Sequence, residues 1–206
     1  YLYKSLLKVP FIINDDYVLP GFIDENTLVV LSSYSGTTEE IIHCGKLALE
    51  KKAKLTGLCV GGGIAEFLKK NHCPVYVFDP KYNPSGQPRI GFGYGVGGNL
   101  GLLMNLGLID EKKESITSAI AALPKLLATF TIETVRKDNP AKQLAEKVYK
   151  SYPYFIVSEF LTGVGNATQN QFNETAKTIS SFRIIPELNH HLMEGLKHPD
   201  EHIKMG

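Results

Sequence analysis

Short apolar runs alternate with longer stretches of helical periodicity through the first hundred residues. The runs have the length and composition of buried strands, and we expect strands at residues 11–13, 27–31, 55–60 and 75–78. Between them, apolar positions recur at helical spacing in 38–52 and 64–70. This βαβα order predicts an α/β fold, with a parallel sheet that carries helices on both faces.

The pattern changes after residue 110. Glycines at 93–98 predict a loop leading into a buried helix at 100–109, and residues 111–139 have a charged, then Leu/Ala/Thr-rich helical pattern that ends at Pro140. A second series follows, with helices expected at 142–150, 163–177 and 189–196, the last capped by Asn189, and strands at 154–157 and 182–185. We therefore predict a first domain at 1–110, a helical linker at 111–139 and an incomplete second domain at 140–206.

Composition narrows the class of protein. The 206 residues are 43% hydrophobic and 21% charged, which excludes a disordered chain or a coiled coil. The formal net charge of +1 provides no broad field for nucleic acid or an anionic membrane. Cys44, Cys59 and Cys73 lack CxxC spacing, and no apolar run reaches the roughly 18 residues of a membrane span. We expect a soluble, cytoplasmic protein with reduced thiols and no nucleic-acid or membrane partner.

The most specific local motif is Ser-Ser-Tyr-Ser-Gly-Thr-Thr-Glu-Glu, at residues 32–40. Hydroxyls and backbone N–H groups beside a helix N-terminus can hold a phosphate monoester without a lysine. The alternative is a capping box formed by Thr37 and Glu40, which leaves Ser33 and Ser35 unexplained. From spacing alone, both interpretations stay open.

At this loop the sequence resembles the SIS (sugar isomerase) domain, a flavodoxin-like phosphosugar-binding fold whose loop has the pattern Ser-x-Ser-Gly-x-Thr. Ser33, Ser35 and Thr38 match its phosphate-contacting positions. Four ordered blocks extend the likeness to the bifunctional phosphoglucose/phosphomannose isomerases of archaea and some bacteria. The blocks are DDYVLPGFIDENTLVVLSSYSGTTEE, PRIGFGYGVGGNLGLLMNLGLI, QFNETAK and PELNHH.

The resemblance implies an activity and its residues. Glu174 and His190 match catalytic positions, and Arg89 matches an active-site arginine. The implied reaction interconverts glucose 6-phosphate or mannose 6-phosphate with fructose 6-phosphate through a cis-enediol. It implies a homodimer with no metal or organic cofactor. Glu174 would move the proton between neighbouring carbons, His190 would open the sugar ring, and Arg89 would stabilise the enediolate.

Each of these residues also permits a structural interpretation. Glu174 could be a solvated helix carboxylate that pairs with Lys177, His190 a surface histidine, and Arg89 a loop cation paired with Asp79. The histidines between 190 and 202 could suggest a metal site, but HExxH is absent and Pro199 interrupts the helix. The glycines of 91–98 lack the preceding strand and the following acid of a dinucleotide loop.

Two rival functions remain: a non-catalytic phosphosugar-binding module, and another SIS-type sugar-phosphate isomerase. The chain also departs from the family at both ends. The family's Gly-Gly-Ser loop has no counterpart before the helix expected near Tyr1, and its catalytic lysine near the C-terminus is missing. We therefore expect the sequence to be a fragment with an incomplete second unit.

Overall fold

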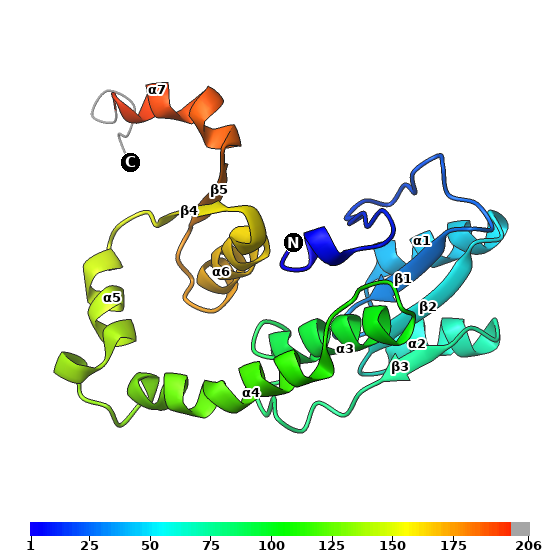
Figure 1. Ribbon diagram of the computed structural model, residues 1–206, viewed down its shortest axis with the longest axis horizontal. Coiled ribbons are helices and arrows are strands. Elements are labelled where there is room, and N and C mark those ends of the chain that lie inside the picture. The colour runs from blue at the N-terminus through cyan, green and yellow to red at the C-terminus, as the bar shows by residue number, and fades with distance from the viewer. Residues whose placement is uncertain (199–206) are drawn as a thin grey trace. The chain divides into compact units, whose positions relative to one another are not determined.

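The computed structural model describes residues 1–198 and divides the chain into two compact units (Figure 1). One unit comprises Leu7–Ile109, and the other comprises Tyr1–Leu6 with the chain from Asp110 onward. Within the described residues, no helix is long and apolar enough to cross a membrane. Each unit is built around a parallel sheet, as the sequence predicts.

The unit Leu7–Ile109 alternates strands and helices. Its elements are β1 (Leu28–Ser32), α1 (Glu39–Glu50), β2 (Lys54–Cys59), α2 (Gly62–Lys70), β3 (Val75–Val77) and α3 (Phe92–Asn105). The strands are parallel in the order β1-β2-β3, with Leu28 opposite Lys54 and Gly57 opposite Val75. The three strands predicted at 27–31, 55–60 and 75–78 are confirmed, as are the two helices between them.

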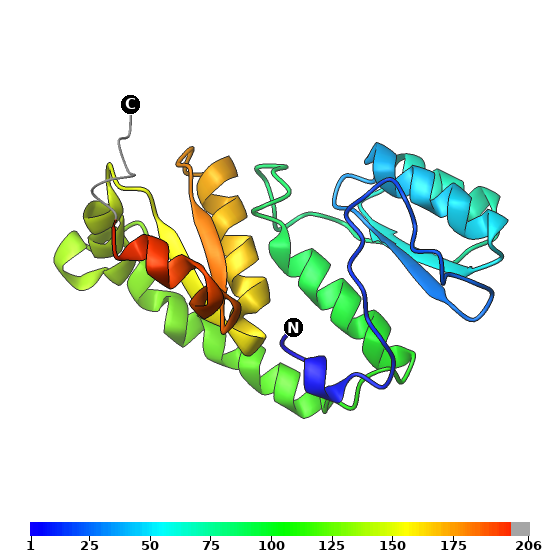
Figure 2. The same ribbon diagram turned by 90° about the horizontal axis from the view of Figure 1, so that it is seen from above.

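Helices cover both faces of this sheet (Figure 2). A Cβ atom on Gly57 would lie 2.6 Å from Cδ1 of Leu68 in α2, whereas the side chain of the next residue, Leu58, contacts Gly98 of α3. Since successive side chains of a strand point to opposite faces, α2 and α3 lie on opposite sides of β2. The core lies on the α1 and α2 face, where Ile64, Leu68 and Cys59 are fully buried.

The strand predicted at 11–13 is wrong. Residues 11–13 form no strand, and Phe11, Ile12 and Ile13 are 50%, 58% and 65% exposed. Further along this segment, Leu19 and Ile23 reach the core instead. An apolar run becomes a strand only where another strand pairs with it, and no pairing forms at 11–13 within the described chain.

The loop predicted at 93–98 is also wrong, because α3 begins at Phe92 and includes these glycines. Glycine inside a helix costs about 1 kcal/mol relative to alanine. Tertiary packing explains Gly98, where a Cβ atom would lie 2.9 Å from Cδ1 of Leu58. The buried helix expected at 100–109 differs too: α3 ends at Asn105, and none of its described residues is buried.

In the described part of the second unit, two strands form a parallel pair. Its main elements are α4 (Lys113–Leu127), α5 (Pro140–Val148), β4 (Tyr154–Ser158), α6 (Thr162–Glu174), β5 (Ser181–Ile185) and α7 (Leu192–Leu196). Tyr154 lies opposite Ser181 in the parallel β4-β5 ladder. Helix α6 connects the strands and packs on them, since Gly165 contacts Val157 and Phe182. The predicted strands at 154–157 and 182–185 are confirmed.

Helix boundaries in this unit differ from the predicted ones. Within 111–139, α4 is followed by 3₁₀ turns at Ala128–Phe130 and Arg136–Asp138 rather than one helix. The side chain of Asn139 caps α5 by accepting from the Lys142 amide at 3.1 Å, and Pro140 occupies the first turn, so α5 begins before residue 142. The predicted cap at Asn189 is wrong, because Glu187–His190 is a 3₁₀ turn and His191 precedes α7.

Candidate phosphosugar site

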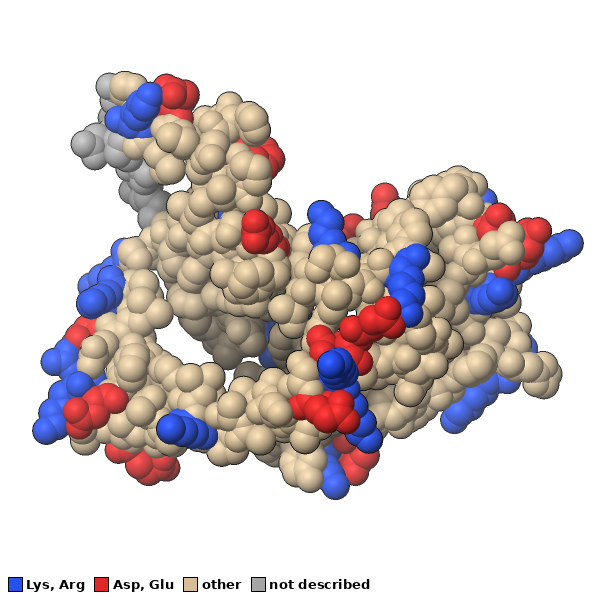
Figure 3. All heavy atoms as spheres, in the orientation of Figure 1, with Lys and Arg blue, Asp and Glu red and all other residues tan. Residues whose placement is uncertain are grey.

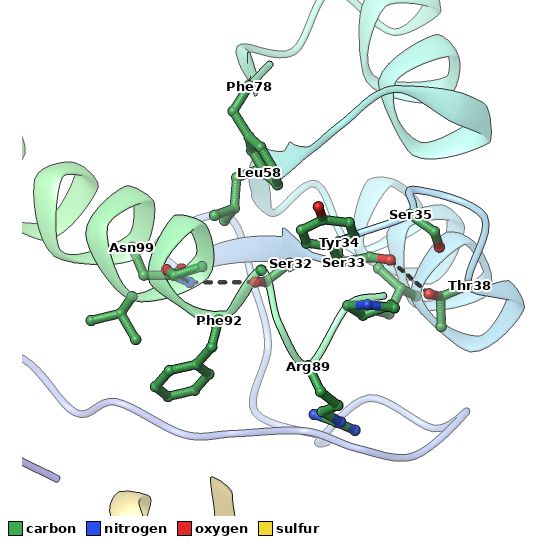
Figure 4. A pocket seen from close by; sticks show the side chains of 15 residues that line it. Ser32, Ser33, Tyr34, Ser35, Thr38, Leu58, Phe78, Arg89, Phe92 and Asn99 are labelled. Carbon is green, nitrogen blue, oxygen red and sulfur yellow. Dashed lines mark hydrogen bonds between the residues drawn. The ribbon is translucent and has the colours of Figure 1, made fainter. Parts of the chain in front are cut away.

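A pocket of about 490 Å³ lies at the carboxyl end of β1 (Figure 4). The loop after β1, the segment around Arg89 and the first turns of α3 form its walls, all within the unit Leu7–Ile109. Ligands in open α/β sheets bind beyond the carboxyl ends of the strands, so this is the expected position for a site. Four of the six predicted site residues line it: Ser33, Ser35, Thr38 and Arg89.

The hydroxyl groups of the loop are linked in pairs. Ser33 Oγ lies 2.7 Å from Thr38 Oγ1, and Ser35 Oγ lies 3.0 Å from Thr37 Oγ1. The Gly36 amide donates to Ser33 Oγ at 3.2 Å, and the Thr37 amide donates to Ser35 Oγ at 3.3 Å. Hydroxyl and N–H groups therefore converge on one turn, and a hydroxyl can rotate to donate to an anion.

The capping-box hypothesis for Thr37 and Glu40 is wrong. The residue that precedes α1 is Thr38, and its side chain makes no hydrogen bond to the first turn of the helix. Thr37 contacts Ser35 instead. The first amides of α1 therefore have no side-chain cap within the described chain. Together with the helix dipole, these amides favour an anion beside the hydroxyl pairs.

The segment that follows β2 is hydrogen-bonded through its main chain to the hydroxyl-rich loop after β1. The amide of Val60 donates to the Tyr34 carbonyl at 2.9 Å, and the amide of Ile64 donates to the Gly36 carbonyl at 2.8 Å. Tyr34 both packs against a neighbouring ring and forms part of the pocket wall. Its ring packs edge-on against Phe78 with the centroids 5.6 Å apart, and the same side chain lines the pocket.

Arg89 also lines the pocket, and in the view of Figure 4 its guanidinium extends away from Ser33 and Thr38. The residue is half-buried and belongs to the turn that leads into α3. A guanidinium in the wall of the pocket can bind an anionic ligand there. Charges on the visible surface are otherwise of both signs and interspersed (Figure 3), in agreement with the near-neutral composition.

Two polar residues of the pocket were missed in the sequence. The Asn99 Nδ2 group donates to Ser32 Oγ at 3.3 Å and to the Gly95 carbonyl at 2.9 Å. This pair lies at the opposite end of the pocket from Thr38 (Figure 4). Leu58, Phe78 and Phe92 provide apolar walls. Helical spacing from Gly95 could have pointed to Asn99 only if 93–98 had been recognised as helix.

The two remaining predicted residues belong to the second unit. Glu174 is the last residue of α6 and is exposed. Lys177 Nζ donates to the backbone carbonyl of Glu174 at 2.7 Å. His190 is exposed and ends the 3₁₀ turn Glu187–His190, and its neighbour His191 pairs with Glu187 at 2.6 Å. Within residues 1–198, no group of three His, Cys, Asp or Glu is placed to hold a metal, and His202 and Pro199 lie outside those residues.

Comparison with known proteins supports the similarity to sugar-phosphate isomerases that the sequence motifs indicate. Residues 137–205 match the model of the bacterial phospho-glucose isomerase C-terminal SIS domain. The chain is 35% identical over 194 residues to a bifunctional phosphoglucose/phosphomannose isomerase of Caldicellulosiruptor bescii, covering 93% of this chain and 56% of that protein. It is 31% identical over 183 residues to the protein of the same name from Thermoplasma acidophilum, covering 88% and 52%. The chain therefore spans about half the length of these curated relatives.

Solved structures show the same fold. A proposed phosphosugar isomerase from Salmonella typhimurium superimposes with a TM-score of 0.57 at 18% identity, over 85% of this chain and 52% of that one. Glucosamine-6-phosphate deaminase from Thermotoga maritima superimposes with a TM-score of 0.53 at 14% identity, over 85% and 51%. The resemblance seen in the sequence is thus confirmed: residues 137–205 match an SIS-domain family, and most of the chain is similar to bifunctional phosphoglucose/phosphomannose isomerases.

Proposed function

We propose that the protein carrying this chain interconverts aldose and ketose hexose 6-phosphates: glucose 6-phosphate or mannose 6-phosphate with fructose 6-phosphate. The observation that carries the proposal is the convergence of three hydroxyl side chains and the uncapped start of α1 on one pocket with Arg89. The sequence similarity to bifunctional phosphoglucose/phosphomannose isomerases supports the same reaction.

In this proposal the phosphate binds at Ser33, Ser35 and Thr38. A dianionic phosphate gains charge-assisted hydrogen bonds from hydroxyls and from amides at the positive end of α1. The apolar walls of the pocket then surround the sugar. Ser32 and Asn99, at the end of the pocket away from Thr38, supply polar groups for sugar hydroxyls. Differences in such polar contacts are what rank closely related sugars.

The chemistry is assigned to three residues. His190 transfers the proton that opens the sugar ring, a task suited to an imidazole near neutral pH. Glu174 takes the proton from C2 of the aldose and returns it to C1, while the proton of the C2 hydroxyl moves to the former carbonyl oxygen. Arg89 stabilises the negative charge that develops on the enediolate oxygen. The atoms balance without a redox step or a cofactor.

We further propose that the protein is a cytoplasmic homodimer. The free thiols of Cys44, Cys59 and Cys73 support the cytoplasmic location.

A Glu174→Gln variant of the full protein tests the assignment. Because general base catalysis typically contributes a factor of about 10² to 10⁴, kcat for fructose 6-phosphate should fall by at least about 100-fold with little change in KM. Glu114→Gln, an exposed carboxylate of α4, is the control and should keep full activity. Unchanged turnover in Glu174→Gln contradicts the proposal. Calorimetric binding of fructose 6-phosphate by a wild type without turnover favours the non-catalytic binding module.

A further inference from the structure

One buried asparagine organises the segment that carries Arg89. Asn83 is only 4% exposed, and every polar atom of its side chain has a partner. Nδ2 donates to the Tyr34 hydroxyl at 2.6 Å and to the Gln87 carbonyl at 2.8 Å. Oδ1 accepts from Ser85 Oγ at 2.6 Å. A buried amide whose donors and acceptor are all satisfied is a rigid junction, because moving it would leave several groups unpaired.

The Gln87 carbonyl connects this junction to Arg89. It accepts from the amides of Ile90 at 3.1 Å and Gly91 at 3.3 Å, so it closes the turn in which Arg89 lies. Asn83 thus holds the same carbonyl that shapes the Arg89 turn. A change at Asn83 would therefore reach the arginine through the main chain.

Tyr34 packs against Gly91, at the C-terminal end of the turn that carries Arg89. A Cβ atom on Gly91 would lie 2.1 Å from Cε2 of Tyr34, so the backbone of Gly91 rests directly on the tyrosine ring. Tyr34 itself lies between the two loop serines, Ser33 and Ser35. Its hydroxyl meets Asn83 and its ring meets Gly91, and these two contacts lie on either side of Arg89 in the sequence.

We propose that Asn83 is a positioning residue that fixes Arg89 relative to the phosphate-binding loop, acting through Gln87 and Tyr34. This inference rests on the proposed isomerase function and deepens it. Asn83 lies outside the pocket lining, so its effect on the reaction is indirect. Since a displacement of about 1 Å at a reacting centre can cost about 100-fold in rate, loss of the junction should lower turnover even though no substrate contact is removed.

The test is a double-mutant cycle in the full protein. Asn83→Ala should lower kcat for fructose 6-phosphate by roughly 10- to 100-fold, while inhibition by inorganic phosphate stays within about twofold. Arg89→Gln alone should lower kcat at least as much. The double variant should be no slower than Arg89→Gln, because the Asn83 junction affects the reaction only through the position of Arg89. Tyr34→Phe, which removes one hydroxyl, is a milder variant that should act in the same direction.

Asn71→Ala is the matched control, since Asn71 Nδ2 also donates to a backbone carbonyl, that of Phe67 at 2.8 Å, and Asn71 does not line the pocket. It should lower the melting temperature without lowering kcat. The positioning role is overturned if Asn83→Ala and Tyr34→Phe keep kcat within about twofold of wild type. It is equally overturned if the effects of Asn83→Ala and Arg89→Gln multiply in the double variant.

Amide hydrogen exchange separates this inference from the proposed reaction. In Asn83→Ala, the amides of Ile90 and Gly91 should exchange at least about 10-fold faster, because the turn that protects them loses its support. Asn71→Ala should leave them unchanged. Faster exchange in a protein whose wild type shows no turnover means that the isomerase proposal fails while the junction stands. Unchanged exchange in Asn83→Ala overturns the junction whatever the activity.

Discussion

Gly36 and Gly61 lie so close together that a side chain on the first would occupy the backbone of the second. A Cβ atom on Gly36 would lie 1.8 Å from the Gly61 carbonyl oxygen, and Gly36 has a φ of +73°. The contact joins the hydroxyl-rich loop after β1 to the loop after β2. The shape of the proposed phosphate site therefore depends on glycine at position 36 for two separate reasons, space and backbone conformation.

Gly36→Ala should consequently destabilise the protein and disturb the pocket. Left-handed strain and overpacking against backbone together predict a loss of at least about 2 kcal/mol in the free energy of unfolding. Gly86→Ala is the matched control, because Gly86 has a φ of +67° but no atom of the described chain within 4 Å of the position that its Cβ atom would take. Urea unfolding of both variants separates the two causes, and equal losses would refute the role of the Gly61 contact.

The hydroxyls of the loop should determine phosphate affinity. Removal of one hydrogen bond to a charged group costs about 1.5–3 kcal/mol, so Ser33→Ala or Thr38→Val should weaken inhibition by inorganic phosphate by about 10- to 100-fold. Thr56→Val is the control, because Thr56 Oγ1 donates to the Pro74 carbonyl at 3.1 Å and does not line the pocket. Phosphate inhibition that is unaltered in both loop variants would place the anion elsewhere.

Gly165 should be required for the packing of α6 on its strands. A Cβ atom there would lie 2.8 Å from Cγ2 of Val157 and 3.0 Å from Cδ2 of Phe182. Gly165→Ala should therefore cost about 1–3 kcal/mol in the free energy of unfolding. Gly163→Ala, whose Cβ atom would be 3.6 Å from its nearest neighbour, should be close to neutral. Chemical denaturation measures both, and an equally stable Gly165→Ala protein would argue against this packing.

The buried thiol of Cys44 should make stability depend on alkaline pH. Burial, followed by the nearby carboxylates of Asp16 and Glu40, raises the pKa of Cys44 above its ordinary value of 9.0. The unfolded thiol then loses its proton at lower pH than the folded one. Its stabilising contribution is thus complete below about pH 9 and falls as the pH rises through the folded pKa.

A comparison of wild type with Cys44→Ala isolates this contribution from other alkaline titrations. The difference in their free energies of unfolding should narrow as the pH rises above about 9 towards the raised pKa of the folded thiol. The Cys44 Sγ group donates to the Asp16 carbonyl at 3.2 Å, and the variant loses this contact at every pH. A difference that stays constant over the whole range would show that the thiol titrates alike in both states.

The pattern of neighbouring residues was sufficient to predict the order of strands and helices and part of the candidate site. The apolar runs of β1, β2 and β4 and the helical spacing of α1 and α6 are properties of neighbouring residues, so they could be predicted. The hydroxyl-rich loop could be recognised for the same reason. Two kinds of prediction remain untested: the domain boundaries at residues 110 and 139, and the catalytic roles of Glu174 and His190.

What the sequence alone determined, then, is the α/β order and the Ser33-to-Thr38 loop, since both depend on contacts within a few residues. Tertiary structure decided the rest of the pocket. Asn83 meets Tyr34 across 49 positions, and Asn99 meets Ser32 across 67. The helical state of 93–98 and the missing strand at 11–13 likewise depend on what packs or pairs with them. Contacts over such separations arise only when the chain folds, so no local pattern reveals them.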